Sequence, residues 1–397
     1  MIDLKAARAD VDGWRAALAR KSAAAEFDAL LAADERWRSL IPRVDELRGK
    51  TKLKGKPTPD ELEALKPVKA ELRAAEEELA AAEAERDAVL ALVPNPPHES
   101  APDGDNEEDA AELSRLGEPP ALENPREHTE VGRFDMERAA RVSGARFGYV
   151  IGDSARVAMA LYQFALDHLA EAGFTPVIPP VLVREEAMYG TGFFPTDRMN
   201  IYALEADGLY LTGTSEVALA SLHMGEKLDK LPLRYTGFST CFRREAGAAG
   251  KDTRGMFRVH QFNKVEMFVF VEPGTSWEEH DRMLDLEEQF LQALGLPYRV
   301  MNVAAGDLGA SAAKKYDIEA WFPFQERYRE VTSCSNTTDY QSRRLGIRYR
   351  AEHGLENPHT LNGTMVTDRA LLAILENFQG GVPDVLTRYG APSEVRA

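Results

Sequence analysis

The chain has 397 residues, 44% of them apolar, which is long enough for two domains with sizeable cores. Its formal net charge of -17 argues against non-specific binding to nucleic acid, because attraction to phosphates requires a positive field. No apolar run approaches the roughly 18 residues of a membrane helix, and the N-terminal MIDLKAARAD lacks the pattern of a signal peptide, so we expect a cytoplasmic protein with no membrane partner.

The first hundred residues predict an antiparallel helical hairpin. Apolar residues recur at heptad spacing from Leu30 to Leu47 and again from Leu65 to Val89. The intervening RGKTKLKGKPTPDE contains Gly and Pro residues that end a helix and permit the chain to reverse. We assign residues 1–105 to this helical domain and residues 106–397 to a second domain.

The turn of the hairpin is strongly basic. It carries five cations with no acidic residue among them: Arg48, Lys50, Lys52, Lys54 and Lys56. Such a run is usually a solvated surface, and that interpretation stays open. The functional alternative is a basic finger that contacts a polyanion at a distance from the acidic body.

The second domain alternates helical and β patterns after a breaker-rich linker at residues 94–120. We expect helices at 156–173, 277–294 and 368–379, a strand followed by a helix within 209–225, and strands at 174–183, 297–306, 328–336 and 359–367. Two further long strands flank a Gly-rich and Ala-rich loop at 246–255. This irregular order favours an α+β fold with a mainly antiparallel sheet flanked by helices over a doubly wound parallel sheet.

The stretch FRREAGAAGKDTRGMFRVHQFNKVE, residues 242–266, gathers cations in an acidic chain. If both flanks are strands, one face of the second strand presents Arg258, His260, Phe262, Lys264 and Glu266, and the first strand adds Arg243 and Glu245. Guanidinium groups bind phosphate, a phenyl ring can stack on a purine, and a carboxylate can accept from an amine. This face suits a nucleoside triphosphate beside an aminated substrate. A solvent-facing strand with ion pairs is the alternative.

Other nucleotide and metal motifs are missing from the sequence. It contains neither a GxxxxGK[ST] loop nor a strand-GxGxxG-helix unit, so P-loop and Rossmann sites are not indicated. Cys241 and Cys334 are the only cysteines and lie far apart, so we expect no disulfide framework and no structural zinc.

The pattern FRREAG followed by RGMFRVHQFNKVE resembles motif 2 of the class II aminoacyl-tRNA synthetases, and in detail it is similar to the seryl-tRNA synthetase family. The likeness extends to the helical arm, PNPPHES, VIPPVLV as the motif 1 strand, EVTSCSNTTDYQSRR, and HTLNGTMVTDRALLAILEN as motif 3. The resemblance implies an antiparallel sheet flanked by helices, ATP as a substrate with Mg²⁺, and a homodimer. It also implies the activation of L-serine and its transfer to serine tRNA, and it leaves selenocysteine tRNA as a possible second acceptor.

The resemblance also implies roles for individual residues. ATP would be bound by Arg243, Arg244, Glu245, Arg258, Phe262, Glu330, Val331, Thr332, Ser333 and Arg369, with Arg243, Arg258, Arg369 and Glu330 as the catalytic set. Serine would contact Thr214, Ser215, Glu216, Arg243, Glu266 and Thr364. Magnesium would be held by Glu330 and Ser333. The arm cations Arg48, Lys50, Lys52, Lys54 and Lys56 would bind the tRNA.

Three positions depart from the family pattern. Ser215 replaces the usual alanine of a Thr-Ala-Glu run, and Thr364 replaces a serine in a motif 3 segment that is one residue shorter than usual. Asp368 stands where Gly or Pro is common, which places a carboxylate next to Arg369. The shortened segment puts the role of Thr364 in question.

Two other functions agree with the same motifs. One is a relative that activates an amino acid for a non-tRNA acceptor, although such relatives typically lack the arm that this chain retains. The other is a catalytically inactive RNA-binding paralogue, which would be expected to have lost Arg243, Glu245, Glu330 or Arg369; all four are present.

Overall fold

The computed structural model describes residues 1–52, 58–246 and 255–396. It divides into two compact units, Met1–Pro96 and Pro97–Ala397, compared with the boundary near residue 105 expected from the sequence. None of the helices in these described ranges is long and apolar enough to cross a membrane.

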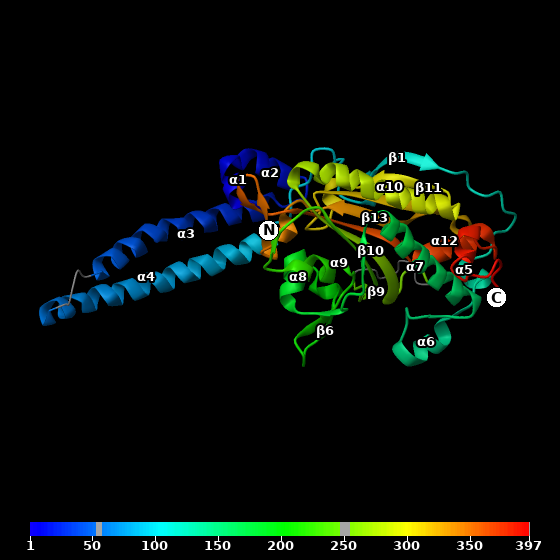
Figure 1. Cartoon of the computed structure of the whole chain (residues 1–397). Helices are drawn as coiled ribbons and strands as arrows, with labels where there is room; N and C mark the ends of the chain where they lie inside the picture. The colour runs from blue at the N-terminus through cyan, green and yellow to red at the C-terminus, as the bar shows by residue number, and fades with distance from the viewer. Residues whose placement is uncertain (53–57, 247–254, 397) are drawn as a thin grey trace. The chain divides into compact units, whose positions relative to one another are not determined.

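The first unit contains the predicted helical hairpin, formed by α3 (Ala24–Thr51) and α4 (Pro59–Leu92), which run alongside each other (Figure 1). Its seam buries Val44, Leu47 and Ala75, in keeping with the heptad pattern. The helices α1 (Leu4–Ala9) and α2 (Val11–Ala19) precede the hairpin and were not anticipated.

The basic turn of the hairpin is partly neutralised. Arg48 forms an ion pair with Glu76 of α4 at 2.9 Å, and Lys50 pairs with Glu46 at 2.7 Å. Lys52 follows the end of α3. Lys54 and Lys56 lie outside the described residues, so the predicted five-cation tip is described only in part.

The second unit is built on a large sheet, which confirms the mainly antiparallel α+β fold. Within the described residues its eight strands follow the order β1-β11-β12-β13-β16-β10-β9-β4. Their bounds are β1 Ala111–Leu116, β4 Thr175–Val177, β9 Leu233–Phe242, β10 Gln261–Val271, β11 Tyr298–Asn302, β12 Lys314–Phe322, β13 Arg327–Asn336 and β16 His359–Thr367. Only β4 and β9 pair in parallel; the other neighbours in these described strands are antiparallel.

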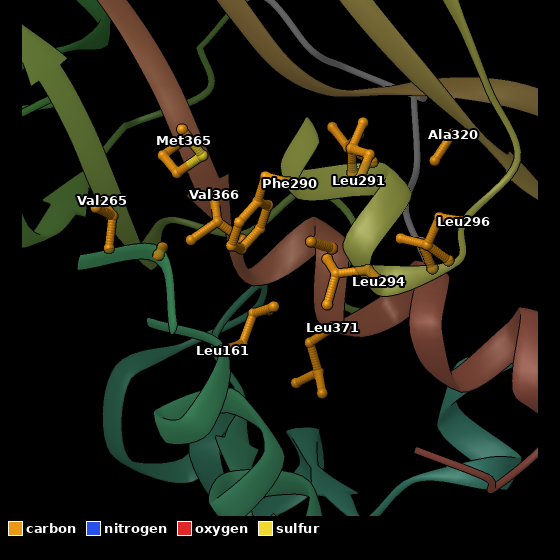
Figure 2. Packing of buried hydrophobic residues seen from close by; sticks show 14 of the residues in the cluster. Leu161, Val265, Phe290, Leu291, Leu294, Leu296, Ala320, Met365, Val366 and Leu371 are labelled. Atoms are coloured by element: carbon orange, nitrogen blue, oxygen red, sulfur yellow. The ribbon is translucent and has the colours of Figure 1, made fainter. Parts of the chain in front are cut away.

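Three helices cover one face of this sheet: α7 (Asp153–Glu171), α10 (Ser276–Leu294) and α12 (Asp368–Phe378). Figure 2 shows Phe290 and Leu294 of α10 close to Leu371 of α12 and Leu161 of α7, beside strand residues such as Val366. Burial of these apolar side chains provides the main driving force for holding the helices on the sheet.

Shorter elements complete the unit. The helices are α5 His128–Val131, α6 Met136–Ser143, α8 Glu185–Thr191, α9 Glu216–Ala220, α11 Tyr340–Arg344 and α13 Asp384–Thr387. The remaining strands are β2 Phe134–Asp135, β3 Tyr149–Val150, β5 Leu182–Val183, β6 Tyr202–Leu204, β7 Leu209–Leu211, β8 Lys227–Leu228, β14 Arg348–Ala351 and β15 Gly354–Glu356.

Several sequence-based boundaries were wrong. Part of the expected linker forms the edge strand β1, and β12 was not anticipated. The single strand expected at 174–183 is two short strands, β4 and β5, which belong to different sheets because Pro179 and Pro180 cannot donate to a ladder. The two strands around the 246–255 loop pair as predicted but are shorter, since β9 ends at Phe242 and β10 begins at Gln261.

Candidate active site

A cavity of about 620 Å³ opens on the sheet face opposite to α10 and is bordered by β10, β13 and β16. Strand alternation explains how β10 serves both sides of the sheet. Phe262, Lys264 and Glu266 line the cavity, whereas Val265 and Met267 point into the hydrophobic core. The predicted face is therefore correct from Phe262 onward.

The same face was wrongly extended toward the N-terminus. Arg258 and His260 precede β10, and Arg243 and Glu245 follow β9, so none of the four belongs to a strand. Glu245 adopts a left-handed backbone conformation, with a φ of 49°, that no strand residue has. Arg258, Arg243 and Glu245 still line the cavity because the chain bends around its rim, and only His260 does not.

One end of the cavity holds a buried cluster around Glu266, which is 1% exposed. The ammonium group of Lys264 contacts the Glu266 carboxylate and donates to Thr214 Oγ1 at 2.7 Å. The Thr214 hydroxyl in turn donates to Glu266 Oε2 at 3.3 Å. Burial raises the pKa of Glu266, and the positive charge of Lys264 acts against this rise.

A second carboxylate, Glu216, lies at this end and is held by two amides. Its Oε1 accepts from Gln341 Nε2 at 2.7 Å and from Asn362 Nδ2 at 3.0 Å. Burial, followed by repulsion from Glu266, raises the pKa of Glu216 to about 7. Two neighbouring acidic groups and one lysine thus form a polar compartment suited to a small zwitterion.

The other end of the cavity is cationic. Arg243 Nε donates to the Gly213 carbonyl at 3.2 Å, and its guanidinium lies 5.2 Å from the centroid of the Phe262 ring. Arg258 donates to Glu245 at 2.6 Å. These contacts place two guanidinium groups, one ring and one carboxylate along a single wall.

A third guanidinium, from Arg369 at the start of α12, pairs with Glu330 of β13 at 2.9 Å. Lys315 lies 3.9 Å from the same carboxylate. Burial would raise the pKa of Glu330, but Lys315 and Arg369 outweigh that effect and lower it to about 2. The carboxylate is therefore ionised at neutral pH, and the Glu330 side chain, which is 40% exposed, lines the cavity.

The described residues contain no cluster of three or more His, Cys, Asp or Glu side chains able to hold a metal by themselves. Glu330 and Ser333 both line the cavity and offer hard oxygen donors. Magnesium is commonly held by one or two carboxylates together with substrate phosphates, so these two residues fit that ion.

Most of the sequence-predicted residues gather in this cavity. Those that line it are Thr214, Glu216, Arg243, Glu245, Arg258, Phe262, Glu266, Glu330, Val331, Thr332, Ser333, Thr364 and Arg369. Ser215 and Arg244 are described but are not among the lining residues. The arm residues Arg48, Lys50 and Lys52 belong to the other unit.

Among the polar residues in or beside the cavity, Lys264, Lys315, Gln341 and Asn362 received no individual role from the sequence. Strand alternation placed Lys264 on the correct face but gave it no role. Gln341 and Asn362 contact Glu216 from α11 and β16, which are far from it in sequence, so local spacing carried no signal for them.

Asp368 does not add a free carboxylate beside Arg369. One of its oxygens accepts from the Tyr162 hydroxyl and the other from the backbone N–H of Asn263 at 3.0 Å. Burial raises its pKa. This departure from the family pattern therefore joins α12 to α7 and β10 and leaves Arg369 paired with Glu330.

Two family models match the chain. One, described as the seryl-tRNA synthetase N-terminal domain, covers residues 1–97, and the other, described as the tRNA synthetase class II core domain (G, H, P, S and T), covers residues 202–378. A serine–tRNA ligase of Acidothermus cellulolyticus is 51% identical over 399 residues, covering 96% of this chain and 94% of that protein. The chain belongs to the seryl-tRNA synthetase family.

Other members of the family agree over the full length. A serine–tRNA ligase of Mycolicibacterium vanbaalenii is 48% identical and covers 98% of both chains. The crystal structure of a seryl-tRNA synthetase from Pyrococcus horikoshii, complexed with ATP, superimposes with a TM-score of 0.92 at 38% identity and covers 100% of this chain and 99% of that one. The arm and the catalytic unit are thus both seryl-tRNA synthetase elements.

Proposed function

We propose that this chain activates L-serine with ATP, forming seryl-adenylate and pyrophosphate, and then transfers serine to the 3′ end of serine tRNA. The observation that carries the proposal is one cavity with a buried polar compartment around Glu216 and Glu266 at one end and three guanidinium groups at the other. The reaction needs this arrangement because the carboxylate of one small zwitterion must meet the α-phosphorus of ATP.

Serine occupies the acidic end in this proposal. Glu216 and Glu266 receive its ammonium and hydroxyl groups, and the Thr214 hydroxyl lies beside them. Lys264 keeps the carboxylate of Glu266 oriented through a direct ion pair. Alanine has no hydroxyl, so it leaves a buried acceptor without a partner, which costs about 1 to 3 kcal/mol.

ATP occupies the cationic end. Phe262 stacks on the adenine, Glu245 accepts from its amino group, and Arg243 contacts the α-phosphate. Arg258 and Arg369 bind the outer phosphates. Val331 and Thr332 line the same cavity and contact ATP in this proposal, and Thr364, which also lines it, contacts serine. Ser215 and Arg244 do not line the cavity and are given no direct contact with either substrate.

Adenylate formation requires no general base. A carboxylate oxygen of serine bonds to the α-phosphorus while the bond to the pyrophosphate oxygen breaks, and the electron pair leaves with pyrophosphate. Arg243 stabilises the charge on the α-phosphoryl oxygens, and Arg258 and Arg369 stabilise the leaving group. Glu330 and Ser333 would hold Mg²⁺, which supplies further charge neutralisation when bound.

The basic hairpin tip, with Arg48, Lys50, Lys52, Lys54 and Lys56, binds serine tRNA in this proposal. An extended helical arm can present cations to a polyanion that the acidic body would repel. Selenocysteine tRNA is a further candidate acceptor that shares this chemistry.

A homodimer in the cytoplasm completes the proposal. Large apolar side chains are exposed on α7 and after β4, including Met159 at 63% and Ile178 at 91% exposure, and such residues are typical of a subunit interface. Light scattering should give the dimer mass for the native chain and a lower mass for Ile178→Asp. A native monomer would contradict this part of the proposal.

The decisive experiment is ATP–pyrophosphate exchange with serine, threonine, alanine or glycine, followed by charging of serine tRNA. Exchange that depends on serine, together with tRNA charging, supports the proposal. Exchange without charging of any tRNA would favour the non-tRNA acceptor. Absence of exchange with all four amino acids would favour the inactive RNA-binding paralogue.

A further inference from the structure

A buried histidine–carboxylate pair lies outside the cavity and has no part in the chemistry above. His128 is the first residue of α5 and is 1% exposed, and Glu376 of α12 is fully buried. Nδ1 of His128 lies 2.7 Å from Glu376 Oε1. The other carboxylate oxygen of Glu376 accepts from the backbone N–H of Phe324 at 3.2 Å.

This pair determines which imidazole nitrogen carries the proton. A carboxylate is an acceptor, so Nδ1 of His128 must be the donor, and in a neutral ring Nε2 is then an acceptor. Nε2 of His128 receives the backbone N–H of Met256 at 3.2 Å. Glu376 therefore acts on Met256 through the tautomer of His128.

Met256 begins the segment that forms part of the phosphate end of the cavity. Its side chain and those of Phe257 and Arg258 line the cavity. The guanidinium of Arg369 lies 4.5 Å from the centroid of the Phe257 ring, so the position of Phe257 also affects that of Arg369.

The space around the imidazole leaves little room for adjustment. Gly255 has a φ of +70°, and a Cβ at this position would lie 2.8 Å from Nε2 of His128. The backbone of residues 255–256 therefore packs directly against the imidazole edge.

We propose that Glu376 and His128 are positioning residues for ATP: they fix the backbone at Met256 and thereby aim Phe257, Arg258 and Arg369 at the triphosphate. The inference rests on the proposed function, since it assigns ATP to this end of the cavity. It predicts a defect in ATP use with little change in serine use, because the pair has no contact with Glu216 or Glu266 among the interactions described.

Three variants separate positioning from simple stability. Glu376 accepts from three groups, because the backbone N–H of His128 also donates to Oε1 at 3.4 Å, beside the His128 ring on that oxygen and the Phe324 N–H on the other. Glu376→Gln keeps the shape but offers one oxygen in place of two, so either the two His128 donors or the Phe324 N–H must face an NH₂ group. His128→Leu removes both ring interactions. His128→Gln retains an amide oxygen for the Met256 N–H and an NH₂ group for Glu376.

We expect the Kd and KM for ATP to rise about 5- to 100-fold in Glu376→Gln and His128→Leu. In His128→Gln the fold-increase should be less than half as large. The KM for serine should stay close to that of the native chain in all three variants. The measurements are calorimetric binding of ATP, exchange kinetics and thermal melting of each variant. Equal ATP binding in all variants, equal loss for ATP and serine, or no rescue by glutamine would overturn the inference. A native chain that does not bind ATP would instead contradict the proposed function.

Discussion

Replacement of Glu266 by Gln should impair the use of serine far more than that of ATP. Glu266 is 1% exposed and contacts Lys264 and Thr214. Its carboxylate is therefore held in place at the end of the cavity that we assign to serine. A hydrogen bond to a charged group contributes about 1.5 to 3 kcal/mol, which corresponds to roughly 10- to 150-fold in kcat/KM. The glutamine keeps the shape, so the loss reports on charge.

The assay is pyrophosphate exchange with serine and with alanine, at saturating ATP. Alanine lacks the hydroxyl, so its kcat/KM should fall less and the serine-to-alanine ratio should decrease. Glu287→Gln is a matched control, because Glu287 is a fully buried glutamate on α10, behind the same sheet, and does not line the cavity. An unchanged serine-to-alanine ratio in Glu266→Gln, or an equal rise in the KM for ATP, would refute the assignment.

The other predictions concern pH, ATP and the arm. The raised pKa of Glu216, about 7, means that its carboxylate forms as the pH rises through 7, so the serine KM should fall between pH 6 and 8; a flat profile would contradict an ionic role. The free energy of unfolding should change in the opposite direction. The stabilising contribution of Glu216 is fully present below its ordinary pKa of 4.5 and is lost as the pH rises through about 7. Urea unfolding should show this loss in the native chain and not in Glu216→Gln. Phe262→Ala should raise the KM for ATP about 5- to 150-fold, from the loss of stacking worth roughly 1 to 3 kcal/mol, and an unchanged KM would remove that role. Deletion of residues 1–96 should leave serine-dependent exchange nearly intact and abolish tRNA charging, whereas a truncated chain that charges tRNA normally would show that the arm is dispensable. The double variant Lys50→Gln, Lys52→Gln should make the slope of log binding constant against log salt concentration for tRNA less steep by about one to two. Lys50 should contribute the smaller part, because it already pairs with Glu46. An unchanged slope would argue against tRNA contact at the tip.

The fold followed from the sequence wherever apolar periodicity was sustained. The heptads of α3 and α4 and the patterns of α7, α10 and α12 predicted their helices, because burial of one face decides those elements. The strand β1 could not be found in this way. All six of its residues are exposed, so pairing with β11 and not burial defines it.

The placement of residues along the cavity followed from the sequence where a single strand carries them. Alternation along β10 placed Phe262, Lys264 and Glu266 correctly, because the buried opposite face fixes the register. The same rule failed for Arg243 and Arg258, which lie beyond the strand ends, and there only the resemblance to motif 2 connected them with phosphate.

Contacts between distant elements were beyond local sequence patterns. Gln341 reaches Glu216 across 125 positions of sequence, and His128 reaches Met256 across 128. No spacing rule links residues so far apart, because their proximity is a property of the completed sheet and of the helices packed on it. The polar residues that orient the site therefore emerged only from the structure.

The ion pairs at the phosphate end explain how an acidic chain can keep a cluster of guanidinium groups. Arg258 pairs with Glu245 and Arg369 pairs with Glu330, so mutual repulsion among the cations is offset before any ligand binds. In the proposed reaction, the triphosphate oxygens replace the two carboxylates as partners of Arg258 and Arg369. Glu245 then binds the adenine amine, and Glu330 binds a cation. Each carboxylate thus has two successive partners. Truncation of either glutamate to alanine should therefore affect both the stability of the free chain and the affinity for ATP, whereas a residue with a purely structural role would affect the first alone.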